Sequence, residues 1–275
     1  MKKVLALLLA FLLLTSLWGC GKKELSAFRT LEVLGTKRYC TICRGGDKLS
    51  PQIEAAMAEL AMRGELQRAA IRWLGSDRSI WDSDSAGLQE LPADEEQSEA
   101  RLLRFGVETD FYPLAFMEND TLQGFCVDLA LGVGEVLGWE VQIIAISPSE
   151  VGTQLSSGNI DCALGFDSSL VKADSYDIGT CFLESDIVLA VRSESEVRRI
   201  KDLQDARVGT ISDPAVLAAL RASENLTKRA SGATEYLSLP RCIEALDKGW
   251  CAAVALDELA LSFYQAAPGA SLAAP

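Results

Sequence analysis

Residues 101–165, RLLRFGVETDFYPLAFMENDTLQGFCVDLALGVGEVLGWEVQIIAISPSEVGTQLSSGNIDCALG, decide the fold class of this chain. Short apolar runs (LLRFGV, WEVQIIAI and IDCALG) alternate there with segments of helical period. That alternation is typical of strands joined by crossover helices in a parallel sheet. The sequence therefore predicts an α/β fold. With 275 residues and 49% hydrophobic content, the chain is long enough for two lobes.

The start of the chain carries a second apolar feature. Two lysines precede the apolar run Val4–Leu14. A basic start and an apolar run too short for an ordinary transmembrane helix are typical of an export signal. We therefore predict a signal peptide over residues 1–19.

The signal ends in Leu17-Trp18-Gly19-Cys20, which resembles the bacterial lipobox. In that motif the cysteine is acylated, and acyl chains hold a protein at a membrane without spanning it. We therefore expect lipidation at Cys20 and an extracytoplasmic, membrane-anchored protein. Trp18 departs from the small residue that the motif prefers, so simple secretion is the alternative.

Charge and composition exclude two classes of partner. The formal net charge is −13, and removing the two signal lysines lowers it by two further units. A nucleic-acid-binding protein needs a basic footprint, so we predict no nucleic-acid partner. The chain also has no histidine, the commonest metal ligand and general base. We predict no metal, no cofactor and no catalytic residue.

The cysteines give no disulfide framework. Seven follow Cys20, and an odd number leaves at least one thiol unpaired in a monomer. Cys40-x-x-Cys43 matches a redox or zinc motif, but TKRYCTICRG reads as a strand, in which residues three apart point to opposite faces. We expect most of the seven to be small, buried apolar side chains.

The stretch 101–165 is similar, phrase by phrase, to the opening of the family 3 extracellular solute-binding proteins, the amino-acid receptors of ABC importers. The resemblance implies a type II periplasmic-binding-protein-like fold, with two lobes joined by two hinge strands. Asp186–Arg192 and Tyr39–Cys43 would be these strands, which permit the lobes to close around a ligand.

The segment before residue 76 resembles the family's ending. Arg44-Gly45-Gly46-Asp47 and Arg72-Trp73-Leu74-Gly75 match its turn and its final helix. We expect a helix capped by Ser50 and ended by Gly64, then a helix over Leu66–Leu74. Residues 24–36 have apolar positions three apart, which favours a short helix or an irregular connection.

The family's last residues thus precede its first, and this order predicts a circular permutation. An unrelated helical extension is the alternative. The acidic segment 76–100 would be the linker, and its length leaves open a monomer or a dimer that swaps residues 31–75.

The expected domains are a signal peptide (1–19), an anchored segment partly packed on lobe 2 (20–37), lobe 1 (38–189, comprising 38–75, the linker 76–100 and 101–189), lobe 2 (190–265) and a flexible tail (266–275).

Lobe 2 has its own strand and helix signals. We expect a strand at Val208–Thr210, followed by a helix that Ser212 or Asp213 caps and that Pro214 opens. IEALDKGWCAAVALDE then resembles a family phrase with a helix at Pro240–Lys248 and a strand at Cys251–Ala255.

The resemblance also implies a ligand site between the lobes. Phe111 matches a stacking aromatic, Asp257 the partner of an α-amino group, and Lys172 the place of a carboxylate-binding arginine. Phe111 as core, Asp257 as a helix cap and Glu108 as a solvated strand end are the alternatives. Several carboxylates against one lysine lead to the hypothesis of a cationic ligand. The candidate site residues are Glu108, Phe111, Asp167, Ser168, Lys172, Asp213 and Asp257.

Three functions remain open at this point. The resemblance favours a membrane-anchored receptor that captures a small amino-acid-like solute and presents it to an ABC permease. A ligand-sensing lipoprotein for a signalling partner is the second. An enzyme similar to the cyclohexadienyl dehydratases is the third, and it is disfavoured because the sequence shows no convincing acid–base pair.

Overall fold

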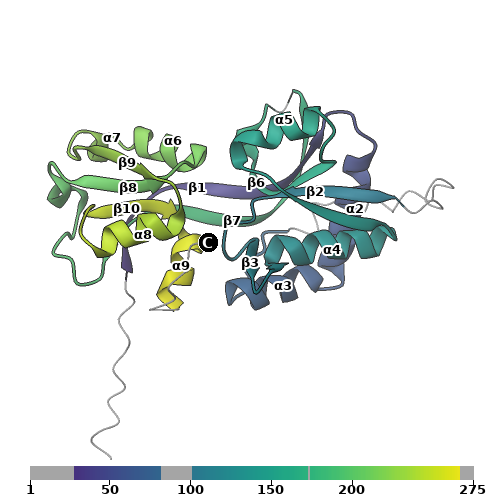
Figure 1. Cartoon of the computed structure of the whole chain (residues 1–275), viewed down its shortest axis with the longest axis horizontal. Coiled ribbons are helices and arrows are strands. Elements are labelled where there is room, and N and C mark those ends of the chain that lie inside the picture. The colour runs from purple at the N-terminus through teal and green to yellow at the C-terminus, as the bar shows by residue number, and fades with distance from the viewer. Residues whose placement is uncertain (1–27, 82–100, 173, 267–275) are drawn as a thin grey trace, which may run out of the picture.

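The structure is a computed structural model that describes residues 28–81, 101–172 and 174–266. One eight-stranded sheet runs through it in the order β5-β2-β6-β1-β7-β10-β8-β9 (Figure 1). The predicted signal, Cys20, most of the linker and most of the tail lie outside the described residues. In chain order the sheet strands are β1 (Phe28–Arg44), β2 (Leu102–Val107), β5 (Glu140–Ala145), β6 (Cys162–Asp167), β7 (Tyr176–Arg192), β8 (Arg207–Ile211), β9 (Gly232–Tyr236) and β10 (Ala253–Asp257).

The helices fall into two groups, one for each half of the sheet. Lobe 1 is built on β5, β2 and β6, and lobe 2 on β10, β8 and β9 (Figure 1). A small hairpin of β3 (Phe116–Glu118) and β4 (Thr121–Gln123) belongs to lobe 1. The helices are α2 (Leu49–Met62), α3 (Glu65–Leu74), α4 (Phe125–Leu137) and α5 (Val151–Ser156) in lobe 1, and α6 (Pro214–Ala222), α7 (Glu224–Thr227), α8 (Leu239–Asp247) and α9 (Glu258–Ala266) in lobe 2.

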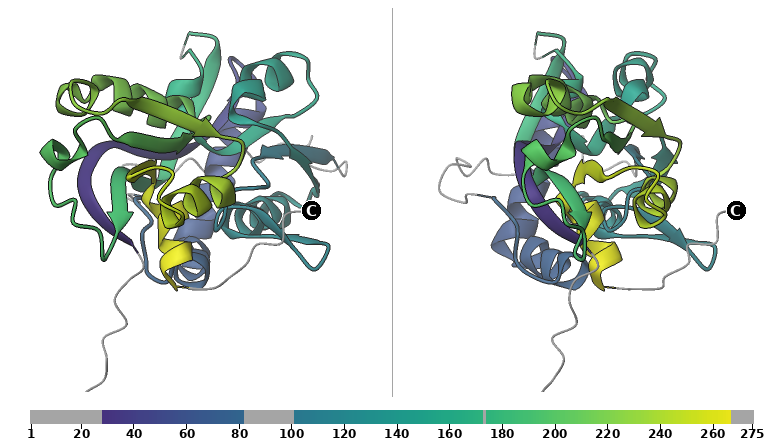
Figure 2. Two further views of the ribbon diagram at one scale, coloured as in Figure 1. Left: turned by 60° about the vertical axis from the view of Figure 1, so that its left-hand side comes forward. Right: turned by 90° about the vertical axis from the view of Figure 1, so that its left-hand side faces the viewer.

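Two long antiparallel strands, β1 and β7, connect the lobes. They pair from Phe28 opposite Arg192 to Arg44 opposite Tyr176. At the lobe 1 end β1 also pairs with β6, and at the lobe 2 end β7 pairs with β10. In both views of Figure 2, β1 (purple) runs as one curved strand from one lobe into the other. The predicted hinge strands are therefore present, and each is longer than predicted.

The helix or irregular connection expected over residues 24–36 is wrong from Phe28 onward, where β1 begins. The pairing of β1 with β7 is interrupted at Leu31 and Leu34, and both side chains pack against the lobe 2 core. A bulge inserts an extra, unpaired residue into one strand and changes the direction of its side chain. Apolar residues three apart therefore mark two bulges here instead of a helical face.

Helices α2 and α3 follow the predicted pattern except at the first cap. The α2 helix starts at Leu49, whose N–H donates to Asp47 Oδ1 at 3.1 Å, so Ser50 is not the cap. Gly64 and Gly75 adopt left-handed backbone conformations beyond the ends of the two helices, as their positions predicted. Both helices pack on α4 of lobe 1.

Cys40 forms a disulfide with Cys181, and this bond joins the two hinge strands. Cys40 therefore does not pair with Cys43, and the C-x-x-C spacing reflects neither a redox pair nor a metal site. The prediction that most cysteines are buried small side chains is confirmed for the other five. These free, buried cysteines of the described residues are Cys43, Cys126, Cys162, Cys242 and Cys251.

Candidate functional site

Two aspartates of lobe 2 lie at one edge of the sheet. The parallel neighbours β8 and β10 end there. Asp257 is the last residue of β10, and Asp213 lies two residues beyond β8. Asp213 Oδ1 accepts hydrogen bonds from the N–H groups of Ala215 (2.9 Å) and Val216 (3.2 Å) and so caps α6, as expected. Its other oxygen, Oδ2, is directed at Lys37 of the hinge strand β1.

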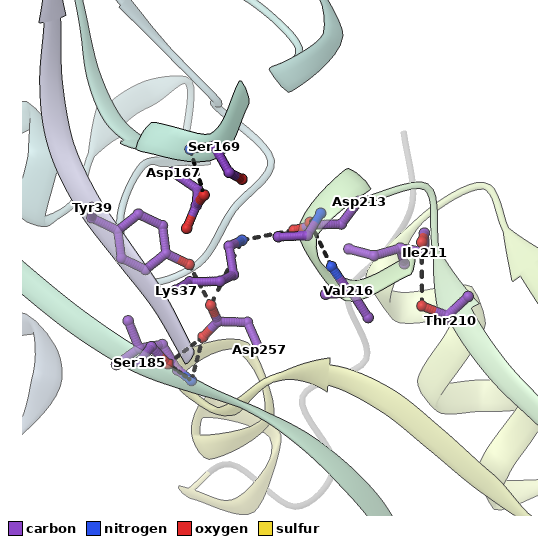
Figure 3. A network of polar contacts seen from close by, with 12 residues as sticks. Lys37, Tyr39, Asp167, Ser169, Ser185, Thr210, Ile211, Asp213, Val216 and Asp257 are labelled. Carbon is purple, nitrogen blue, oxygen red and sulfur yellow. Dashed lines mark hydrogen bonds and ion pairs between the residues drawn. The ribbon is translucent and has the colours of Figure 1, made fainter. Parts of the chain in front are cut away.

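Asp257 is held in a similar way at the start of α9. Its Oδ1 accepts from the N–H of Leu259 at 2.8 Å and from Ser185 Oγ at 2.6 Å (Figure 3). Its Oδ2 accepts from the hydroxyl of Tyr39. The residue is 3% exposed. Asp257 is therefore both a helix cap and a buried carboxylate directed at the hinge.

A single lysine ammonium lies between these carboxylates and the aromatic rings of lobe 1. Lys37 Nζ is 2.7 Å from Asp213 Oδ2 and 3.8 Å from Asp257 Oδ2 (Figure 3). It also lies 5.1 Å from the ring centroid of Tyr39 and 5.5 Å from that of Phe111. Lys37 is only 6% exposed. We call Lys37, Tyr39, Phe111, Asp213 and Asp257 the amine cluster.

Burial and charge set the protonation states in and beside the cluster. Burial alone lowers the pKa of Lys37, but the carboxylates of Asp257 and Asp213 outweigh this effect and raise the pKa above its usual value. Burial, followed by the charge of Asp257, raises the pKa of Tyr39 well above its usual value. Lys37 therefore stays charged, and Tyr39 stays a neutral hydrogen-bond donor.

Glu108 lies just beyond β2 and is half-buried. Burial raises its pKa to about 7, although the charge of Lys37 opposes this shift; the charges of Asp213, Asp110 and Asp257 raise it further. Glu108 is thus within electrostatic reach of the amine cluster, and it changes charge near neutral pH.

The remaining predicted residues occupy different places. Asp167 ends β6, is buried, and accepts from the N–H groups of Arg38 (3.1 Å) and Ser169 (2.9 Å). Ser168 is half-buried in the short 3₁₀ helix Ser168–Leu170. Lys172 is exposed beyond that helix. The structure therefore brings Phe111, Asp213 and Asp257 together, with Glu108 near them, and leaves Lys172 at the surface.

Three residues of the site were missed by the sequence reasoning: Lys37, Tyr39 and Ser185. Lys37 and Ser185 lie opposite each other in the register of β1 and β7. One signal was present for Lys37: it stands two residues before Tyr39, and residues two apart in a strand share a face. Ser185 had no comparable signal, because its contact with Asp257 spans 72 residues of sequence.

Two surface pockets lie elsewhere on the described residues. One is lined by α3 and α4, around Arg72 and Asp128. The other is lined by α2 and the start of β7, around Glu54 and Trp81. Neither includes a residue of the amine cluster. We place the candidate site at the cluster because two buried carboxylates of lobe 2, a buried lysine of the hinge strand β1 and the Phe111 ring of lobe 1 converge there. Within the described ranges, no group of three or more metal-ligating side chains is assembled.

The fold is that of a two-lobed binding protein. It has two lobes on one sheet, two hinge strands and a charged cluster between the lobes. The family model for bacterial extracellular solute-binding proteins, family 3, matches residues 103–254, more than half of the chain. The chain belongs to this family.

Sequence and structure comparisons agree on this fold. The arginine-binding extracellular protein ArtP of Bacillus subtilis (strain 168) is 24% identical over 114 residues, which are 41% of this chain and 45% of ArtP. The chain therefore spans less than half the length of this relative.

Two solved structures illustrate the fold. An ABC uptake transporter substrate-binding protein from Streptococcus pneumoniae with bound histidine has a TM-score of 0.55 and 20% identity, over 61% of this chain and 70% of that one. The ancestral amino-acid-binding protein AncCDT-1, a precursor of cyclohexadienyl dehydratase, has a TM-score of 0.52 and 19% identity, over 59% and 73%. At such identities the likeness shows the fold.

Proposed function

We propose that this protein captures a small solute bearing a cationic amine between its two lobes and delivers it to an ABC permease. The observation that carries the proposal is the amine cluster, in which one ammonium is held by Asp213 and Asp257 of lobe 2 and faced by Phe111 of lobe 1. Charge-assisted hydrogen bonds to carboxylates and a cation–π contact are the interactions that recognise an amine. We propose binding and not catalysis.

We propose closure around the solute because its binding groups belong to different lobes. The carboxylates belong to lobe 2 and the ring to lobe 1, with β1 and β7 as the connection between them. A ligand stabilises the closed state only through contacts that the open state lacks. An ammonium that touches both faces provides such contacts.

The names of the relatives support a cationic amino acid as the solute class. ArtP is named an arginine-binding protein, and the Streptococcus pneumoniae structure holds histidine. In our proposal the α-amino group binds Asp257, and Glu108 or Asp213 takes a second positive charge. Asp167 and Ser168 complete the lobe 1 wall, and Lys172 reaches the ligand carboxylate from the rim.

The cellular setting and the chain order are also proposals. We propose a signal over residues 1–19 and a lipid anchor at Cys20. None of the helices in the described ranges is long and apolar enough to cross a bilayer.

The proposed circular permutation is supported by the family match, which begins at residue 103, while β1 and α2 upstream of it complete lobe 1. We propose that the lobe is completed within one chain, giving a monomer.

Calorimetry on the full chain, freed of co-purified ligand by unfolding and refolding, tests the proposed function. We expect binding of arginine, lysine or a polyamine, and a smaller radius of gyration by X-ray scattering at saturation. An Asp257→Asn variant, which keeps a side-chain oxygen but loses the charge, should bind at least about tenfold more weakly. Tight binding of glutamate or leucine alone, or an unchanged radius, would refute the proposal.

A further inference from the structure

The amine cluster already contains an amine, and it belongs to the protein. Lys37 lies on β1 at the middle of the hinge, opposite Ser185 of β7. We propose that Lys37 is an internal cation that occupies the amine subsite, so that a solute ammonium binds there only when the Lys37 side chain withdraws. This inference rests on the proposed function, and it makes Lys37 the residue that sets affinity and specificity.

The contacts of Lys37 are those that a bound amine would make. Its Nζ has one oxygen of Asp213 at 2.7 Å, one oxygen of Asp257 at 3.8 Å, and two aromatic rings within 5.5 Å. Each carboxylate uses its other oxygen for the N–H groups at a helix start. The carboxylates are therefore positioned by the backbone and do not depend on Lys37 for their orientation.

The charge balance favours this role over the opposite one, in which Lys37 would bind a ligand carboxylate. Asp213, Asp257 and Glu108 all act on Lys37 electrostatically. An incoming carboxylate would meet these negative charges at close range, whereas an incoming ammonium would replace the lysine charge without loss. A cation is therefore the ligand that fits this position.

The lysine side chain is also suited to leave. Its four-methylene stem has freely rotating bonds and ends in a compact charge. While Lys37 occupies the subsite, only the withdrawn fraction of molecules can bind, and the apparent affinity falls by that fraction. A lysine in place about 90 to 99% of the time would weaken amine binding by about ten- to a hundredfold.

The test compares the full chain with Lys37→Met, which keeps the length and apolar stem but removes the charge. The probes are arginine and n-butylammonium chloride, the latter as a copy of the lysine side chain. We expect Lys37→Met to bind at least one probe about tenfold more tightly than the unaltered chain. Lys201→Met, at an exposed lysine of lobe 2, should bind like the unaltered chain.

A rescue experiment covers a variant that folds poorly. Lys37→Ala leaves two buried carboxylates without a cation, so its unfolding temperature should fall. Millimolar n-butylammonium should restore the unfolding temperature, and equal concentrations of butyrate or sodium chloride should not. If Lys37→Met folds, no gain of affinity in it overturns the inference; if it does not fold, absence of selective rescue of Lys37→Ala overturns it.

The outcomes separate this inference from the proposed function. If both chains bind amines and Lys37→Met binds more tightly, both stand. If only Lys37→Met binds, the inference stands and solute capture by the unaltered chain fails. If both bind equally, or the variant binds more weakly, the inference is overturned and the proposed function stands. If neither binds and no rescue occurs, both are overturned.

Discussion

The two faces of the amine cluster are built differently. On the lobe 2 face, Asp213 and Asp257 each receive backbone N–H donors at a helix start and are almost fully buried. On the lobe 1 face, Phe111 offers a ring, and Glu108 is a half-buried carboxylate whose pKa is raised to about 7. We call the lobe 2 side the fixed face, because its two carboxylates are oriented by backbone N–H groups. We call the lobe 1 side the adjustable face, because the charge of Glu108 changes near neutral pH.

Under the proposed function, this difference implies an order of events. An incoming cation would meet its strongest partners on lobe 2, because backbone N–H groups already orient the two carboxylates. The lobe 1 face would add contacts on closure of the hinge. Four predictions test how far this contrast between the lobes holds.

The largest effect concerns the completion of lobe 1. A chain that starts at residue 101 lacks β1, which pairs with both β6 and β7, and lacks the α2 side chains Met57 and Leu60, which are buried. We expect no cooperative unfolding transition in circular dichroism with urea. The matched control moves residues 28–75 behind residue 266, and this chain should fold. A chain from residue 101 that folds and binds like the full chain would show the permutation proposal to be wrong.

The next effect concerns the fixed face. Asp257→Ala leaves Lys37 with one carboxylate and leaves Tyr39 and Ser185 without their acceptor. Removing one partner of a buried ion pair costs about 3 to 5 kcal/mol. Ser185→Ala, which removes one donor to the same carboxylate, should cost about 1 kcal/mol. Urea unfolding measures both. Equal costs for the two variants would mean that the charge of Asp257 is not what stabilises the site.

The hinge between the faces should respond to loss of the Cys40–Cys181 disulfide. The bond closes a loop of 141 residues and joins β1 to β7. Replacing both cysteines with alanine should lower the free energy of unfolding by about 2 to 4 kcal/mol. Dithiothreitol should reproduce this loss in the unaltered chain and leave the double variant unchanged. A loss of the same size when dithiothreitol is added to the double variant would assign the effect elsewhere.

The fourth prediction concerns Glu108 on the lobe 1 face and depends on pH. Glu108 has a pKa of about 7 in the folded protein against an ordinary value of 4.5, so the folded state holds the proton more tightly. Its contribution to stability is fully present below pH 4.5 and is lost as the pH rises to about 7. Relative to Glu108→Gln, the unaltered chain should lose about 3 kcal/mol across this range.

Urea titrations at pH 4.5, 6 and 7.5 measure that difference. Ionisation of Glu108 adds a negative charge beside the cluster, so affinity for a cationic amine should rise through pH 7 in the unaltered chain and stay flat in Glu108→Gln. Parallel stability profiles for the two chains would contradict the assignment.

Much of the fold could be predicted because its signals are local. Asp213-Pro214 marks the start of α6, and Gly64 and Gly75 mark the ends of α2 and α3; each depends on the conformation of a few neighbouring residues. The hinge strands were also recognised, although β1 was cut short. Its first half takes its conformation from β7, more than 150 residues away, and its bulges imitate a helical spacing.

The candidate site divides in the same way. Asp257 was predicted from the family resemblance, and Asp213 was predicted as the cap before Pro214. The structure brings both to the edge of the sheet at which the parallel strands β8 and β10 end. The sequence pointed to Lys172 as the lysine of the site, whereas the structure places Lys172 at the surface and Lys37 in the cluster. The contact of Lys37 with Asp213 spans 176 residues, and no local pattern reports it.

Local patterns in the chain suffice for the α/β class, the helix start at Asp213 and the apolar faces of both lobes, because these follow from propensity and periodicity over short windows. The identity of the ammonium that faces the two carboxylates, and of the cysteines that are joined, depends on long-range packing. Both depend on the register of β1 against β7, since a shift of one residue would turn Lys37 and Tyr39 to the other face of the sheet.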